Sequence, residues 1–173
     1  MDTVKIILNN KELPIYTSYF SNKSLNDNCI CINLANRPSS QFKPSFVDYL
    51  PAIPDSRILS RWYKSTKSME DKISYIKDYY KSNLVGEICV NFIKDLTASS
   101  VVNELFEENP EPDKVVLLCH ELPGTFCHRL IFSIFLDIMT GVKIQELDNE
   151  NIFECEDAIL IRDTLNNLIG GGK

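Results

Sequence analysis

The segment from Lys114 to Gly141 constrains the fold of this chain more than any other stretch. An apolar run, Val115 to Leu118, ends at Cys119 and is bounded by turn signals, a pattern that predicts a buried strand. After a polar turn, a longer apolar run from Leu130 to Met139 stops at a glycine, which predicts a buried helix. The segment is therefore predicted to form a strand, a loop and a helix. In open parallel sheets, ligands bind beyond the carboxyl ends of the strands.

The loop of this unit gathers the reactive side chains of the protein. The chain has two histidines, and both lie here, each directly after a cysteine, in the pairs Cys119-His120 and Cys127-His128. We therefore expect the functional site at this loop.

The composition limits the classes of protein to which the chain can belong. Its 173 residues are predicted to form a single domain, 1–173, with 44% hydrophobic and 24% charged residues, as in ordinary soluble proteins. The net charge of −6 and the pI of about 5.0 argue against a general nucleic-acid coat and against a binder of anionic membranes. Both need an excess of Lys and Arg, although a local basic pocket is compatible with this charge.

The cellular location is inferred from what the sequence lacks. No apolar stretch is long enough to span a bilayer, and the first residues do not have the pattern of a signal peptide, so we expect a cytoplasmic protein without a membrane partner. The six cysteines are then expected to be reduced thiols, and without a C-x-x-C pair they give little support to a structural zinc site. We expect no metal and no cofactor. The richness in Lys, Asn and Ile is typical of an AT-rich bacterial or phage genome.

The remaining patterns predict strands that alternate with helices. Strands are predicted for Val4–Leu8, Leu13–Phe20, Cys29–Leu34 and Val142–Leu147, and the last of these is expected next to the central strand. Helices are predicted for Ser68–Leu84, for a segment from Thr97 or Ser99 to Glu108, and for a segment from Asp157 or Ala158 to Leu168. Short helical turns are predicted for Phe46–Leu50 and Ile58–Tyr63. This order predicts a three-layer, Rossmann-like α/β fold with a mostly parallel sheet flanked by helices.

Two smaller patterns add to this prediction. Cys29 and Cys31 point to the same face of their predicted strand and are expected to fill the core. Trp62 lies among the basic residues Arg57, Arg61 and Lys64. It either covers the core with its apolar body or forms the wall of a pocket for an anionic or flat ligand.

Cys127 is predicted to lie at the N-terminus of the central helix, where unpaired N–H groups and the helix dipole favour an anion. These groups would either hold a bound phosphate or carboxylate or lower the pKa of the Cys127 thiol. Arg129 in the first helical turn is poorly placed for the dipole, so we expect it to face an anionic group. That group is either Glu121 or a ligand.

The other reactive residues of the loop each allow two interpretations. His128 either hydrogen-bonds the loop backbone or performs acid–base chemistry beside Cys127. Cys119 is either packed in the core or a resolving thiol for Cys127. A zinc site gathered across the loop is a further alternative, although Cys119 and His120 point to opposite faces of a strand and cannot easily share one ion.

The motif Cys119-x-Glu121, five residues, then Cys127-His128-Arg129 resembles the signature of the domain of unknown function family 488. Weaker similarity extends over a core of about 14–147 and excludes the C-terminal helix and frayed tail, 156–173. It includes the stretches Tyr49–Ser56 and Trp62–Lys64 and the pair Tyr79-Tyr80. The resemblance implies a compact α/β domain in which the loops 33–40 and 119–129 face each other. It does not imply a reaction.

The chain departs from the family pattern at the end of one predicted strand. The Asp and Arg of the family fall on Asn33 and Ala35 here, and Arg37, two residues on, is placed to supply the lost charge. A site that depended on that Asp would be altered or lost.

The leading hypothesis is a pocket for a phosphate-bearing ligand, such as a nucleotide, another anionic small molecule or a nucleic-acid end. It would be built from Asn36, Arg37, Ser39, Cys119, Glu121, Cys127, His128 and Arg129. If the protein is an enzyme, Cys127 is the candidate nucleophile, His128 or Glu121 handles the proton and Arg129 clamps the anion. A phosphatase of the Cys-x5-Arg kind is disfavoured, because Arg129 lies only two residues after Cys127.

Two rival hypotheses come from other classes of protein. In the first, the protein binds without chemistry, and the Cys-Glu-Cys-His-Arg cluster is a structural clasp between strand end and helix start. In the second, Cys119 and Cys127 form a redox-responsive pair, which requires their Cα atoms to be close enough for a disulfide. The sequence leaves the oligomeric state open.

Overall fold

The computed structural model describes residues 5–8, 10–26, 28–85, 88–108, 111–141, 144–148 and 152–171. Its strands are β1 (Lys5–Leu8), β2 (Lys11–Tyr19), β3 (Cys29–Asn33), β4 (Phe46–Asp48), β5 (Lys114–Cys119) and β6 (Gln145–Glu146). The strand order is β1-β2-β5-β3-β4, and β6 also pairs with β2. Strands β2 to β6 pair in parallel, and β1 pairs with β2 in antiparallel as the first half of a hairpin.

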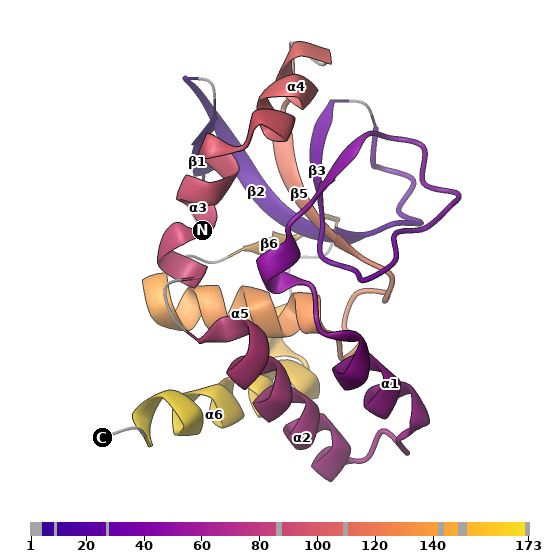
Figure 1. Cartoon of the computed structure of the whole chain (residues 1–173), viewed down its shortest axis with the longest axis vertical. Coiled ribbons are helices and arrows are strands. Elements are labelled where there is room, and N and C mark those ends of the chain that lie inside the picture. Colours follow the sequence, from indigo (N-terminus) through magenta and orange to yellow (C-terminus); the bar gives the residue numbers. More distant parts are fainter. Residues whose placement is uncertain are drawn as a thin grey trace.

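Helices flank this sheet (Figure 1). They are α1 (Ser56–Lys64), α2 (Met69–Tyr79), α3 (Ile88–Ala98), α4 (Ser100–Glu108), α5 (His128–Thr140) and α6 (Glu156–Gly170). A π-helical turn, Tyr80–Leu84, extends α2, and short 3₁₀ turns occupy Leu50–Ala52 and Ile152–Glu154. The predicted α/β class with a mostly parallel sheet flanked by helices is confirmed. No helix in the described ranges is long and apolar enough to cross a membrane.

The central strand β5 is buried on both faces, which explains its uninterrupted apolar sequence. Val115 and Leu117 pack into the main core beneath the helices, whereas Val116 and Leu118 belong to a second apolar cluster on the opposite face. Cys31 and its neighbour Cys29 fill that second cluster, as predicted from their alternation.

Helix α5 follows β5 as the sequence predicts. Cys127 is its N-cap residue, and Gly141 ends it in the left-handed conformation with a φ of 72°. Its residues 128–136 are all buried, including His128, Arg129 and Ser133, so the first part of the helix is buried around its whole circumference rather than on one stripe. The strand–loop–helix unit is therefore confirmed, and it is the centre of the fold.

The start of α2 is also confirmed. The Ser68 hydroxyl accepts a hydrogen bond from the Asp71 backbone N–H, and the Asp71 carboxylate accepts one from the Ser68 N–H. This reciprocal arrangement satisfies two N–H groups that a helix terminus otherwise leaves unpaired.

Three predicted details differ from the structure. Residues Phe46–Asp48 form strand β4 rather than a helical turn, because their backbone pairs with β3 at the sheet edge. Strand β6 pairs with β2 rather than with the central strand, whose two edges are already occupied by β2 and β3. Residues 142 and 143 of that predicted strand lie outside the described residues.

Helix α3 is the third difference, since no element is predicted for Ile88–Ala98 from the sequence. Apolar residues at 88, 89, 90, 92 and 93 form no single helical stripe, so the periodicity is weak. Phe92 and Leu96, four residues apart, nevertheless bury one face of this helix in the main core.

Candidate functional site

A cleft with a volume of about 400 Å³ lies at the carboxyl ends of β3 and β5. The chain leaves these two neighbouring strands in opposite directions, from β3 outward to β4 and from β5 across β2 to β6. Such a switch in direction opens a crevice between adjacent parallel strands, which is where α/β sheets bind ligands. The lining residues come from the loop after β3, from α1 and from the β5–α5 segment: Ala35, Asn36, Arg37, Ser56, Leu59, Ser60, Tyr63, Lys64, Cys119, His120, Glu121 and His128.

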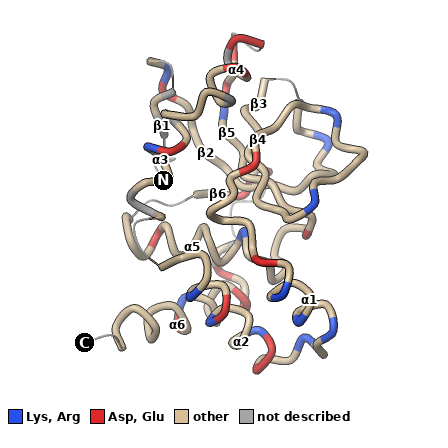
Figure 2. Tube along the Cα trace, viewed as in Figure 1, with Lys and Arg blue, Asp and Glu red and all other residues tan. Residues whose placement is uncertain are grey.

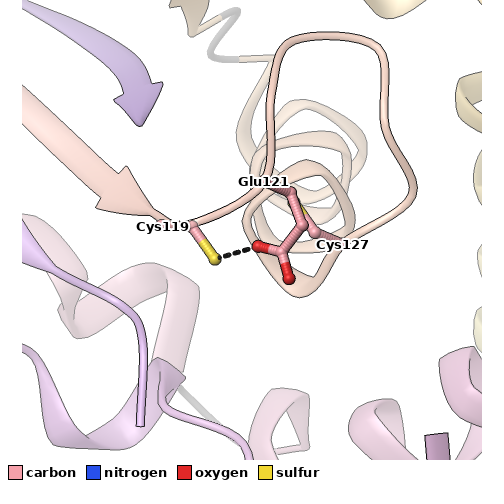
Figure 3. A group of neighbouring side chains, drawn as sticks. All are labelled: Cys119, Glu121 and Cys127. Atoms are coloured by element: carbon pink, nitrogen blue, oxygen red, sulfur yellow. Dashed lines mark hydrogen bonds between the residues drawn. The ribbon is translucent and has the colours of Figure 1, made fainter. Parts of the chain in front are cut away.

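A thiol and a carboxylate meet at the wall of this cleft. The Cys119 Sγ donates a hydrogen bond to Glu121 Oε2 over 2.7 Å (Figure 3). The same sulfur lies 3.5 Å from His128 Nε2. Cys119 ends the central strand and is almost fully buried, whereas Glu121 is partly exposed. The geometry therefore offers a thiol with a proton acceptor in direct contact.

His128 is held by the backbone of the facing loop. Its Nε2 lies 2.6 Å from the Leu34 carbonyl oxygen, and because a carbonyl only accepts hydrogen bonds, this nitrogen carries the proton. The first interpretation from the sequence, a histidine bonded to loop backbone, matches this contact. The same N–H also points toward the Cys119 sulfur, so His128 supports Cys119 rather than Cys127.

The loops 33–40 and 119–129 face each other. The Leu34 N–H donates to the Leu118 carbonyl over 2.9 Å, and His120 Nε2 lies 2.5 Å from the Arg37 carbonyl oxygen. The His120 ring also contacts the ring of Phe20 at 5.0 Å between centroids. These contacts join the two sides of the cleft.

Cys127 does not line the cleft and is buried among α5 and the end of β5. Its pKa is raised well above the ordinary value, first by a hydrogen bond to Cys119 and then by burial. The helix N-terminus therefore does not make this thiol a thiolate, which is opposite to the pKa direction considered from the sequence. Cys119, not Cys127, is the cysteine that lines the cleft, although its side chain is only 1% exposed.

Arg129 faces neither Glu121 nor the cleft. Only 1% exposed, it forms an ion pair with Glu146 of β6 at 3.5 Å between Nη2 and Oε1, and its Nη1 donates to the Ser18 carbonyl of β2. The other Glu146 oxygen accepts a hydrogen bond from the Thr17 hydroxyl at 2.5 Å. Burial raises the pKa of Glu146, against the opposing effects of Arg129 and Thr17. The anionic partner of Arg129 is therefore Glu146, not Glu121 or a ligand, and it lies far from Arg129 along the chain.

Of the three predicted pocket residues on the loop after β3, two line the cleft and one does not. Asn36 and Arg37 line the cleft, and the Asn36 amide also reaches the Pro54 carbonyl at 3.5 Å. Ser39 does not line it, and its hydroxyl instead accepts a hydrogen bond from the Gln41 N–H.

Sequence analysis missed the wall contributed by α1, which consists of Ser56, Leu59, Ser60, Tyr63 and Lys64. The one available signal was the basic group around Trp62, and Figure 2 shows that basic positions recur along α1. Trp62 itself packs on the rings of Tyr75 and Phe126, with centroids 5.3 and 4.8 Å away, so it covers the core. Its neighbours on the helix, rather than Trp62, face the cleft.

Asn33 joins the ends of β3 and β4. Its side-chain N–H groups donate to the Ala35 carbonyl at 2.8 Å and to the Asp48 carboxylate at 2.6 Å, while its oxygen accepts from the Ala35 N–H. Both the nitrogen and the oxygen of the Asn33 amide are therefore hydrogen-bonded, and an aspartate in its place would face the Asp48 carboxylate.

We expect Asn33→Asp to lower the free energy of unfolding by about 1–3 kcal/mol, because two buried donors are lost and a like charge meets Asp48. Urea denaturation followed by circular dichroism measures this change. The double variant Asn33→Asp with Asp48→Asn should recover part of the loss by restoring one donor opposite one acceptor. An unchanged midpoint in the single variant would show that the Asn33–Asp48 contact is not formed.

A comparison of the chain with models of protein families, with curated proteins and with solved structures finds no match.

Proposed function

We propose that the cleft binds a phosphate-bearing small molecule, such as a nucleotide, and that the thiol of Cys119 is the reactive group facing it. The observation that carries this proposal is the Cys119–Glu121 contact on the wall of a cleft at the crevice between β3 and β5. The resemblance to family 488 agrees with the location, because its signature residues Cys119 and Glu121 are the ones that form the contact. We place the protein in the cytoplasm, where thiols stay reduced.

Two cations favour an anionic ligand. Arg37, on the loop after β3, and Lys64, on α1, are exposed and line the cleft, and neither forms an ion pair with a described residue. An arginine fork and a lysine ammonium are suited to phosphate oxygens. The hydroxyls of Ser56 and Ser60 add neutral hydrogen-bond donors from α1. A phosphate held by these groups would occupy the cleft that Cys119 also lines.

The thiol step follows from the same geometry. The Cys119 sulfur attacks an electrophilic carbon or phosphorus of the bound molecule as its proton passes to the Glu121 carboxylate. The leaving group departs with the bonding electron pair, and the new bond joins the sulfur to the ligand. His128, whose N–H points toward the sulfur, stabilises negative charge there during the step.

The thiol assignment is tested by alkylation of the folded protein between about pH 5 and 9, read residue by residue with peptide mass spectrometry. Cys119 is expected to react before Cys127, because it alone of the two lines the cleft. Inorganic phosphate, AMP or ATP should slow its modification. If Cys119 stays unmodified until the protein unfolds and none of the three compounds changes its rate, the cluster is structural and this proposal is wrong.

Binding of AMP and ATP by calorimetry tests the two cations. Arg37→Gln and Lys64→Gln are each expected to weaken binding by about 10-fold, the value of one lost charged hydrogen bond. Arg57→Gln and Lys77→Gln are matched controls outside the cleft and should leave affinity unchanged. Equal losses in all four variants would indicate non-specific attraction rather than a site.

A non-enzymatic binding protein is the second candidate, and the buried part of the motif favours it. Arg129 and Cys127 are buried, and Arg129 joins α5 to β2 and β6, as a structural clasp would. Under this candidate AMP or ATP still binds, but Cys119 remains unmodified by reactive analogues. A redox-responsive pair, the third candidate, requires a disulfide between Cys119 and Cys127 when the protein is oxidised, which mass spectrometry detects directly.

A further inference from the structure

We propose that Cys119, Glu121 and Cys127 form a binding site for one thiophilic divalent cation, and that Zn²⁺ is the ion whose chemistry fits best. The two sulfurs and one carboxylate oxygen all lie within 4.8 Å of one another. Figure 3 shows the three side chains converging where β5 ends and α5 begins. The ion would take up Cys119 and Glu121 as ligands, so the thiol step proposed above would belong to the ion-free protein.

The distances are compatible with a single ion. Zinc binds thiolates at about 2.3 Å and carboxylate oxygens at about 2.0–2.2 Å, so its ligand atoms lie about 3.5–3.8 Å apart in a tetrahedron. The present Cys119–Glu121 contact of 2.7 Å contains a proton, and an ion would replace that proton and lengthen the contact. Small side-chain rotations suffice, because every pair of donor atoms already lies within 4.8 Å.

The scaffold positions the two thiols before any ion arrives. Cys119 is the last residue of β5, and Cys127 is the N-cap residue of α5, so both backbones belong to regular elements. Glu121 follows on the connecting loop, which is closed by a hydrogen bond from the Thr125 N–H to the Leu122 carbonyl. Ligands fixed on rigid elements lose little freedom when a metal binds.

The charges of the surroundings also favour a cation. Two thiolates and a carboxylate would bring three negative charges to a largely buried place, and Arg129 interacts with all three groups. A divalent ion would offset the two negative charges that Arg129 leaves.

The fourth position of the ion would open toward the cleft. Cys119 and Glu121 line the cleft, whereas Cys127 lies behind them. The His128 Nε2–H donates to the Leu34 carbonyl and is therefore not a ligand, although it can hydrogen-bond the Cys119 sulfur. Three protein ligands and one open position are the arrangement of catalytic zinc sites, in which water or a substrate oxygen completes the tetrahedron.

The test is a titration of the full-length, EDTA-treated and reduced protein with Co²⁺, followed by displacement with Zn²⁺. We expect one equivalent of Co²⁺ to produce thiolate-to-cobalt charge-transfer absorption that Zn²⁺ abolishes. Cys127→Ser and Glu121→Gln should each weaken binding by more than about 100-fold. Cys155, the N-cap residue of α6, lies outside the cluster, so Cys155→Ser is the matched control and should bind as the unmodified chain does.

Glu121→Gln keeps the test decisive if Cys127→Ser fails to fold, because Glu121 is partly exposed. The metal site would be overturned if the unmodified protein gave no charge-transfer band. It would also be overturned if Glu121→Gln and Cys127→Ser gave the same band as the unmodified protein at the same Co²⁺ concentration. AMP and ATP binding is measured in parallel with EDTA present. If the unmodified protein binds AMP or ATP but gives no cobalt band, the metal site is refuted and the proposed function stands. If it gives the cobalt band but binds neither nucleotide, the proposed function is refuted and the metal site stands.

Discussion

Replacing Arg129 by methionine is expected to lower the free energy of unfolding by about 3–5 kcal/mol, the cost of leaving one member of a buried ion pair without its partner. Arg129 ties the start of α5 to the Ser18 carbonyl of β2 and to Glu146 of β6. Its removal leaves the Glu146 carboxylate in an apolar place with only the Thr17 hydroxyl as a partner. Urea denaturation at neutral pH, followed by circular dichroism, measures the loss.

A control variant and a double variant test whether the loss comes from the buried ion pair. Arg162→Met removes an arginine from the more exposed Arg162–Asp137 pair, so it should cost no more than about 1 kcal/mol. The double variant Arg129→Met with Glu146→Met should recover most of the loss, because Arg129 Nη2 and Glu146 Oε1 have no hydrogen-bond partner in the described structure and an apolar pair leaves no charge behind. A loss below about 1 kcal/mol for Arg129→Met alone would contradict the buried pair.

Replacing Phe132 by alanine is expected to cost about 3–5 kcal/mol, through lost burial and the cavity that remains. The Phe132 ring is fully buried and lies edge-on to Phe92 of α3, with centroids 5.3 Å apart. Both rings also contact Tyr49, which follows β4. The three rings join α5, α3 and the sheet edge, so thermal and urea unfolding should both shift to lower midpoints.

Met139→Ala is the matched control for this prediction. Met139 lies on the same helix but is 48% exposed, and its truncation should change stability by no more than about 0.5 kcal/mol. Phe92→Ala should cost nearly as much as Phe132→Ala, and the double variant should cost less than the sum, because the rings share one contact. Strict additivity would show that α3 does not pack on α5.

Several features were predictable from the sequence because they depend on neighbours along the chain. The buried strand β5, the start of α2 after Ser68 and the glycine stop at Gly141 each follow from a local pattern. The location of the candidate site was predictable for the same reason, since a loop between a buried strand and a buried helix lies at the sheet's carboxyl edge. α3 was not predictable, because its apolar residues do not fall on one helical stripe.

The division of roles within the site was decided by the tertiary structure. The sequence favoured Cys127 as the reactive thiol and considered Glu121 or a ligand as the partner of Arg129. The fold turns Cys119 toward the cleft and brings Glu146 to Arg129. These outcomes depend on which segments, distant in the sequence, pack against each other in the fold. The local periodicity of the sequence does not predict such contacts.

What the sequence by itself determined is the α/β class, the central strand–loop–helix unit and the identity of the residues gathered at its loop. The tertiary structure decided which of them face solvent, which are buried against each other, and that α1 closes the cleft. The physical reason is the range of the interactions. Backbone hydrogen bonding and side-chain periodicity act over a few residues, whereas burial and charge pairing depend on β2, β3 and β6 packing around β5 and α5.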